Sequence, residues 1–129
     1  MSVHESVNDF SHEIIGAAVE VQRVLGTGLL EGAYASALAI ELAEREIGFT
    51  RDVALSASYK GRSLGEVYRA GFVIEQSVIV ELKAVDLLTD LHRSQVLAAL
   101  RLSGLKLGLL INFNVFPVVK GVHRIVSKP

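Results

Sequence analysis

The chain has 129 residues, of which 50% are apolar and 21% are charged. This length is enough for one hydrophobic core and too short for two, so we expect residues 1–129 to form a single domain. The absence of cysteine excludes disulfides, thiolate nucleophiles and cysteine-ligated zinc. Thirteen basic residues against fourteen acidic ones leave no global field that would attract a polyanion.

The sequence also lacks the patterns of a membrane or secreted protein. Its longest apolar stretches, such as residues 107–111, are far shorter than the roughly twenty residues of a membrane-spanning helix. The N-terminus, with His4, Glu5 and Asp9, has neither the basic start nor the apolar run of a signal peptide. We therefore expect a cytoplasmic protein that does not contact a membrane.

Apolar residues at helical spacing predict two helices joined by a glycine-rich turn. We expect Asn8 and Asp9 to cap the first helix, which ends before Gly26. The second is expected over residues 30–46, ended by Gly48. The residues expected on the buried sides are Phe10, Ile14, Ala17, Ala18, Val21 and Leu25 in the first helix, and Leu30, Tyr34, Ala37, Leu38 and Leu42 in the second.

The period then changes to that of strands. Residues 53–59, 67–74 and 78–84 are expected to form an antiparallel meander with turns at 60–62 and 75–77. A third helix over 89–103 should end at Gly104, and the nearly all-apolar residues 106–111 are typical of a strand buried on both faces. Residues 122–126 are a candidate edge strand. The residues expected on the buried face of the third helix are Leu91, Gln95, Ala98 and Leu102.

This order of elements predicts an α/β fold. It has an N-terminal helical hairpin, a mixed central sheet of four to five strands and one crossover helix. The candidate edge strand near the C-terminus makes a homodimer plausible, and nothing in the sequence decides it.

Glu81 and Lys83 place two charges in an otherwise apolar strand. They lie two residues apart, so they share a face of that strand. If the chain turns around Gln76, Gly71 stands opposite Glu81 and Arg69 opposite Lys83. One face of this hairpin is then plain core: Ala70, Phe72, Ile74, Val78, Val80 and Leu82.

The other face carries a polar cluster of Arg69, Gly71, Glu81 and Lys83. From spacing alone, a salt-bridged pair at the mouth of a sheet explains Glu81 and Lys83 well. The alternative is a ligand site, since burying unpaired charge costs several kcal/mol. The apolar residues directly before Glu81 and an acidic residue near the start of the second helix favour the site.

That second helix begins with Gly28-Leu29-Leu30-Glu31-Gly32-Ala33-Tyr34. With this motif the chain resembles the GxxExxY family, a branch of the PD-(D/E)XK nuclease superfamily. The resemblance covers nearly the whole chain. It rests on residues 15–21, on Val80-Glu81-Leu82-Lys83-Ala84, on Gln95 and on residues 107–113.

The resemblance implies a restriction-endonuclease-like fold and magnesium-dependent hydrolysis of phosphodiesters in DNA or RNA. Carried over, Glu31 and Glu81 hold Mg²⁺ or Mn²⁺, Lys83 positions the attacking water, and Gln95 supports the site. Magnesium prefers hard oxygen ligands, which agrees with two glutamates.

The chain departs from this family at the metal-bridging acid. The family reads Arg-x-Asp-Phe where this chain reads Arg69-Ala70-Gly71-Phe72. Glycine supplies no ligand, so we expect metal binding that is weak or lost and little nuclease turnover. Ala99 is a second departure, since the family tends to place an aromatic residue there. The rival hypothesis is a nucleic-acid- or protein-binding module that keeps the fold without its chemistry.

Two basic clusters remain. The first contains Lys60, Arg62 and Arg69, and the second contains Lys120, His123, Arg124 and Lys128. Scattered surface cations are the usual explanation for such clusters, and contact with a phosphate backbone is the alternative.

Overall fold

The computed structural model of the chain describes residues 9–127. The helices within this range are α1 (Ser11–Leu25), α2 (Glu31–Glu44), α3 (Asp90–Ser103) and the short 3-10 helix η2 (Val118–Gly121). The strands are β1 (Phe49–Tyr59), β2 (Arg62–Ile74), β3 (Val78–Lys83), β4 (Leu107–Asn112) and β5 (Val122–Val126). None of the helices described is long and apolar enough to cross a membrane.

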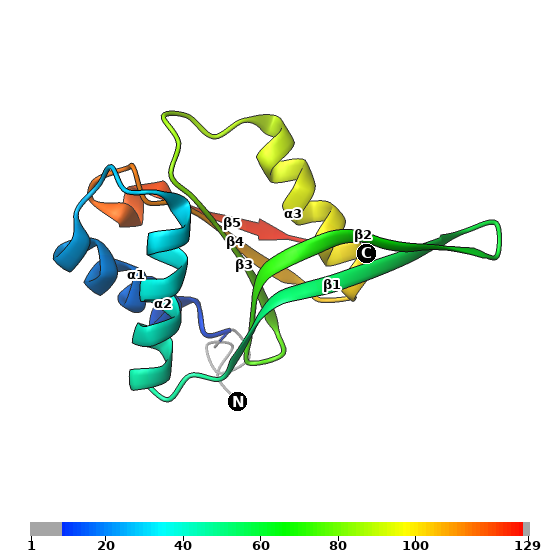
Figure 1. Ribbon diagram of the computed structural model, residues 1–129, viewed down its shortest axis with the longest axis horizontal. Coiled ribbons are helices and arrows are strands. Elements are labelled where there is room, and N and C mark those ends of the chain that lie inside the picture. The colour runs from blue at the N-terminus through cyan, green and yellow to red at the C-terminus, as the bar shows by residue number, and fades with distance from the viewer. Residues whose placement is uncertain (1–8, 128–129) are drawn as a thin grey trace, which may run out of the picture.

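The strands form one mixed sheet in the order β1-β2-β3-β4-β5. Neighbouring strands are antiparallel except β3 and β4, which are parallel and connected through α3. A parallel pair needs such a crossover, because the chain must return to the starting end of the sheet before the second strand can run in the same direction. Helices α1 and α2 cover one face of the sheet and α3 covers the other (Figure 1).

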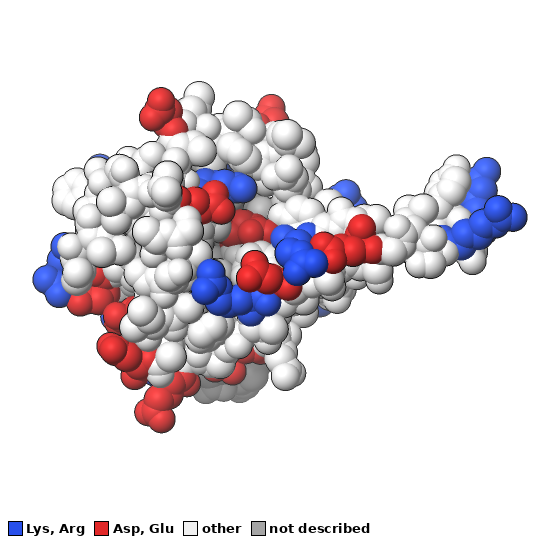
Figure 2. Space-filling model, viewed as in Figure 1, with Lys and Arg blue, Asp and Glu red and all other residues white. Residues whose placement is uncertain are grey.

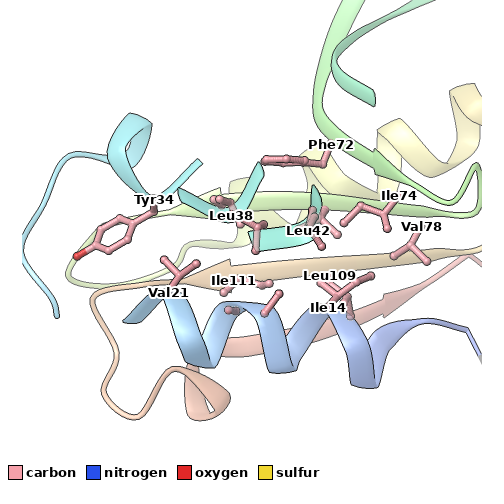
Figure 3. Packing of buried hydrophobic residues seen from close by; sticks show 14 of the residues in the cluster. Ile14, Val21, Tyr34, Leu38, Leu42, Phe72, Ile74, Val78, Leu109 and Ile111 are labelled. Atoms are coloured by element: carbon pink, nitrogen blue, oxygen red, sulfur yellow. The ribbon is translucent and has the colours of Figure 1, made fainter. Parts of the chain in front are cut away.

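The larger core lies between the α1–α2 hairpin and the sheet (Figure 3). Tyr34 and Phe113 are fully buried there and stack with ring centroids 4.6 Å apart. The predicted buried residues of α2 are confirmed for Tyr34, Leu38 and Leu42. Leu30 was predicted wrongly. It is 85% exposed because it precedes the helix in extended conformation as its N-cap.

The start of α1 also differs from the prediction. Its N-cap is Phe10, whose side chain makes no capping bond. Asp9 nevertheless satisfies the first helical amide, because its Oδ1 accepts a hydrogen bond of 3.1 Å from the Ser11 backbone N–H. The other residue expected to cap α1, Asn8, lies outside the described residues.

The smaller core lies under α3, and it corrects the predicted face of that helix. Val96, Ala99 and Leu100 are the buried residues of α3, whereas Leu91 is 64% exposed. Apolar residues occur around most of this helix, so their spacing defines no single stripe. The buried side is decided by where the sheet lies. Ala99 is 0% exposed there, and adding volume at a fully buried position of a packed core requires repacking.

Strands β1 and β2 are longer than predicted. They form a two-stranded ribbon that projects well beyond the rest of the molecule (Figure 1). The expected turn is confirmed at its tip, where Lys60 and Gly61 both have positive φ, as a two-residue hairpin loop requires. We call residues 56–67 the arm. The sequence underestimated it because residues 62–66 contain one large apolar side chain, Leu64, among polar or small residues and show no alternation.

Candidate functional site

Glu81 is the acidic residue most deeply placed in the sheet. It lies on β3 and is 9% exposed. Both of its carboxylate oxygens accept hydrogen bonds from β2. The Tyr68 hydroxyl donates to Oε2 at 2.6 Å, and the Gly71 backbone N–H donates to Oε1 at 3.1 Å. The carboxylate is therefore held by strand β2 on one side of the site.

Burial raises the pKa of Glu81 above its usual value, and the negative charge of Glu31 adds to this effect. The hydrogen bonds from Tyr68 and Gly71 and the positive charge of Lys83 act in the opposite direction, without cancelling it. The pKa of Tyr68 is raised too, first by burial and then by its bond to Glu81. The net effect of these surroundings is to disfavour the charged form of Glu81.

Gly71 faces Glu81 as the predicted register requires. The pairs Phe72 with Val80 and Ile74 with Val78 are confirmed, and the ladder ends there. Beyond the last of these pairs, the Gly71 backbone N–H donates its hydrogen bond to the Glu81 side chain. A Cβ added at Gly71 would lie 2.8 Å from Glu81 Oε1, so the carboxylate occupies the space where a side chain at position 71 would begin.

Two predictions about this hairpin were wrong. Ala70 does not share a face with Phe72 but packs with Ile79 in the core under α3. The alternation is interrupted beside it, where Asp52 has a φ of 53°. Arg69 does not join Glu81 and Lys83 either. It is exposed and forms an ion pair of 2.6 Å with Glu66, its neighbour on the same strand.

A pocket of about 230 Å³ brings Glu31, Gly71 and Glu81 together. Glu31 is exposed as the first residue of α2. The turn before it is held by the Tyr34 hydroxyl, which donates to the Gly26 carbonyl at 2.8 Å and accepts from the Leu29 N–H at 3.2 Å. The buried ring of Tyr34 thereby fixes where α2 begins.

Two of the predicted site residues lie outside the lining of this pocket. Lys83 is half-buried at the end of β3, where its charge still lowers the pKa of Glu81. Gln95 is half-buried on α3, the helix on the opposite face of the sheet from α2. Lys83 therefore acts on Glu81 electrostatically, and the supporting role of Gln95 stays a prediction.

Two charged residues that line the pocket, Arg51 and Asp52, were not predicted from the sequence. Both are exposed on β1, opposite the stretch of β2 that contains Gly71. They were missed because the first strand was expected to begin at residue 53. The available signal in the sequence was Asp52, an acidic residue directly before the predicted strand over residues 53–59.

The residues present do not fit a tightly bound metal ion. Among residues 9–127, no three histidine, aspartate or glutamate side chains come close enough to hold one. Both oxygens of Glu81 are already engaged by protein donors, and the position opposite is glycine. Mg²⁺ demands several oxygen ligands in near-ideal octahedral geometry, and this arrangement supplies too few.

Comparison with known proteins agrees with this fold. The family model of the PD-(D/E)XK nuclease superfamily matches residues 8–125. The chain belongs to this superfamily. Its five-stranded mixed sheet with helices on both faces is a restriction-endonuclease-like fold. Nucleases of the superfamily usually use divalent metals. No curated protein and no solved structure matches the chain.

Proposed function

We propose that this chain is a nuclease-type domain of the GxxExxY kind, formed by residues 1–129, that binds nucleic acid but hydrolyses it poorly. Its site consists of Glu31 and Glu81 as the remaining metal-binding acids, with Lys83 as the catalytic cation and Gln95 in support. Gly71 stands where the third acid is expected. Metal binding, with Mg²⁺ or Mn²⁺, is then weak or lost.

One observation carries this proposal. The carboxylate of Glu81 is folded onto Gly71, where it accepts the backbone N–H and fills the space of the missing side chain. A side chain at position 71 would lie too close to Glu81 Oε1, so the carboxylate would have to move. Glycine at this position therefore removes one carboxylate and leaves a second one, which also lines the pocket, hydrogen-bonded to the backbone.

Gly71→Asp tests the proposal. The new carboxylate would lie beside those of Glu81 and Glu31, and like charges at short range repel. We expect this variant to be less stable than the wild type without metal. A divalent cation relieves the repulsion, so Mg²⁺ or Mn²⁺ should raise its stability by about 2.7 kcal/mol at 100 times the Kd. Calorimetric titration and thermal unfolding measure both effects.

Gly71→Asn is the matched control. Asparagine has nearly the same size and displaces Glu81 equally, but it adds no charge. We expect it to lose stability without gaining a response to metal. A nicking assay on plasmid, single-stranded DNA and RNA should then show cleavage only for Gly71→Asp.

The alternative is a non-catalytic module that keeps the fold for binding. The protein donors on both oxygens of Glu81 favour it, because they stabilise this carboxylate without a metal. If Gly71→Asp shows neither tighter metal binding than Gly71→Asn nor cleavage, the nuclease proposal is wrong and the binding module replaces it.

A further inference from the structure

The arm is stabilised by fewer contacts than the rest of the sheet. Strand β2 pairs with β3 only over residues 72–74, so the arm consists of two strands with no third beside them. Two-stranded ribbons are marginally stable by themselves. The arm nevertheless exposes Tyr59, Leu64 and Val67 by 62%, 57% and 45%. Burial of apolar surface in the hydrophobic core therefore does not explain why the chain forms this arm.

The arm is slender because its paired positions carry small side chains. Ser58 lies opposite Ser63, and Ala57 lies opposite Gly65. The two shifts in register leave Leu64 and Val67 without partners on β1, as β-bulges that increase the twist of the ribbon. A thin, twisted ribbon of this kind is narrow enough to enter a groove.

The charge of the arm is concentrated at its tip. Lys60 and Arg62 are exposed there, and the one acidic residue of the arm, Glu66, lies at its base, where it forms an ion pair with Arg69. Figure 2 shows blue side chains at the end of the arm and mixed charges where it joins the body. Arg62 pairs across the turn with Tyr59, whose ring lies 5.4 Å from Lys60 Nζ. The tip is therefore a cationic surface with an aromatic ring beside it.

We propose that the arm docks into the major groove of duplex DNA, with Lys60 and Arg62 contacting the phosphates. This inference rests on the proposed function, since it supplies the contact by which the nuclease-type domain holds its nucleic acid. The major groove of B-form DNA admits a two-stranded ribbon, whereas the major groove of duplex RNA is too deep and narrow. Cations at the tip match the charge of the groove edges.

The position of the arm relative to the pocket supports this assignment. The same two strands continue from the arm into the pocket, which Arg51 and Asp52 of β1 and Gly71 and Phe72 of β2 line. At a rise of about 3.3 Å per residue, the tip lies roughly 20 Å along β1 from Val53. The cationic tip and the pocket therefore lie on one continuous two-stranded ribbon.

A second copy of the chain is the competing occupant. Interfaces between proteins concentrate large aromatic and aliphatic anchors at their centre. The paired positions of the arm carry mostly serine, alanine and glycine, and its exposed aromatic ring, Tyr59, lies beside Lys60 and Arg62. This composition favours a polyanionic groove over a protein surface.

The test compares two double variants of the full chain. In Lys60→Asn/Arg62→Gln the tip loses both charges, and asparagine tolerates the positive φ of position 60. In the control, Lys106→Gln/Lys120→Gln, two exposed cations outside the arm are removed. Fluorescence anisotropy with a labelled duplex of about two helical turns gives the Kd from about 50 to about 200 mM salt. Circular dichroism verifies that both variants are folded.

We expect the arm variant to bind DNA at least about tenfold more weakly at about 50 mM salt, and its salt slope to fall in magnitude by about 2. The control should change the slope by less than about 1. If the wild type binds DNA and both variants bind alike, the arm proposal is wrong while nucleic-acid binding stands. If neither the wild type nor Gly71→Asp binds DNA or RNA, the proposed function fails and the arm proposal fails with it.

Two further outcomes separate the alternatives. Equal binding of duplex RNA, with the same loss in the arm variant, would contradict docking into the major groove of DNA. Loss of self-association in sedimentation velocity, with DNA binding unchanged, would assign the arm to a second copy of the chain.

Discussion

Polar side chains are buried in two regions of the molecule, and the two regions differ in the kind of polar group that they bury. At the end of β4, Gln22 is 4% exposed and Asn112 is 2% exposed. Gln22 donates to the carbonyls of Phe113 and Val115 at 3.0 and 2.7 Å and accepts from the Val118 N–H at 2.8 Å. On β3, by contrast, the buried polar group is the carboxylate of Glu81.

The two kinds of group differ in their effect on stability: the buried amides stabilise the fold, whereas burial of the Glu81 carboxylate costs stability. An amide both donates and accepts while remaining neutral, so Gln22 satisfies backbone groups of the loop after β4 without desolvating a charge. Glu81 receives two hydrogen bonds, yet burial still raises its pKa. A carboxylate held in this way is typical of a functional site, where ionisable groups are retained at a cost in stability.

Gln22→Leu should give the largest effect. The substitution leaves the Phe113 and Val115 carbonyls and the Val118 N–H without partners in a buried region. We expect a loss of about 3 kcal/mol in the free energy of unfolding, measured by urea denaturation. Glu20→Gln on the same helix breaks only an exposed ion pair with Arg23, so it should stay within about 0.5 kcal/mol. Equal effects of the two variants would contradict the structural role of Gln22.

Tyr68→Phe, in the region around Glu81, should lower stability less than Gln22→Leu does. It removes the hydroxyl that donates to Glu81 Oε2, and a hydrogen bond of this kind contributes about 1 kcal/mol to stability. It also raises the pKa of Glu81 further, because that hydrogen bond favours the ionised form. NMR titration of the Glu81 carboxyl measures the shift. Tyr59→Phe at the exposed arm is the control, and an unchanged pKa in Tyr68→Phe would show that burial alone sets it.

Glu81→Gln tests the same comparison through the pH dependence of stability. The pKa of Glu81 in the folded protein lies above the ordinary value of 4.5 for a glutamate. As pH rises from 4.5 through the folded pKa, the unfolded chain ionises first and the wild type loses stability. Glutamine does not ionise, so the stability of the variant relative to the wild type should rise over this window and level off above it. Thermal unfolding at several pH values measures the trend, and a constant difference would contradict strain at Glu81.

Arg124→Gln should give the smallest effect. Arg124 pairs with Asp9 and holds the start of α1 against β5, but half of its side chain is exposed. The pKa of Asp9 is lowered to about 2, mainly by the hydrogen bond from Arg124. Stability from this pair is present above the unfolded pKa of 3.8 and is lost as pH falls toward about 2. We expect a loss of about 0.5 kcal/mol at neutral pH, seen by urea denaturation, and none at strongly acidic pH.

Local patterns predicted a substantial part of the fold and of the candidate site. The helical hairpin, the antiparallel meander, the crossover helix and the edge strand β5 are confirmed. The register that sets Phe72 opposite Val80 is confirmed as well, because a short turn leaves few ways to pair two strands. The placement of Glu31 near Glu81 came from the resemblance, and the structure puts both on one pocket.

The order of the elements, and the strand that carries a buried charge, could be predicted from local sequence. Periodicity and turn residues act over a few positions, so short stretches of the chain are enough to recognise them. The fold as a whole sets which side of α3 is buried, brings Asp52 to the pocket and places Glu81 against Gly71. It also decided that the ends of β1 and β2 leave the sheet as a free arm. These features depend on where distant elements pack, and no short stretch of sequence contains that information.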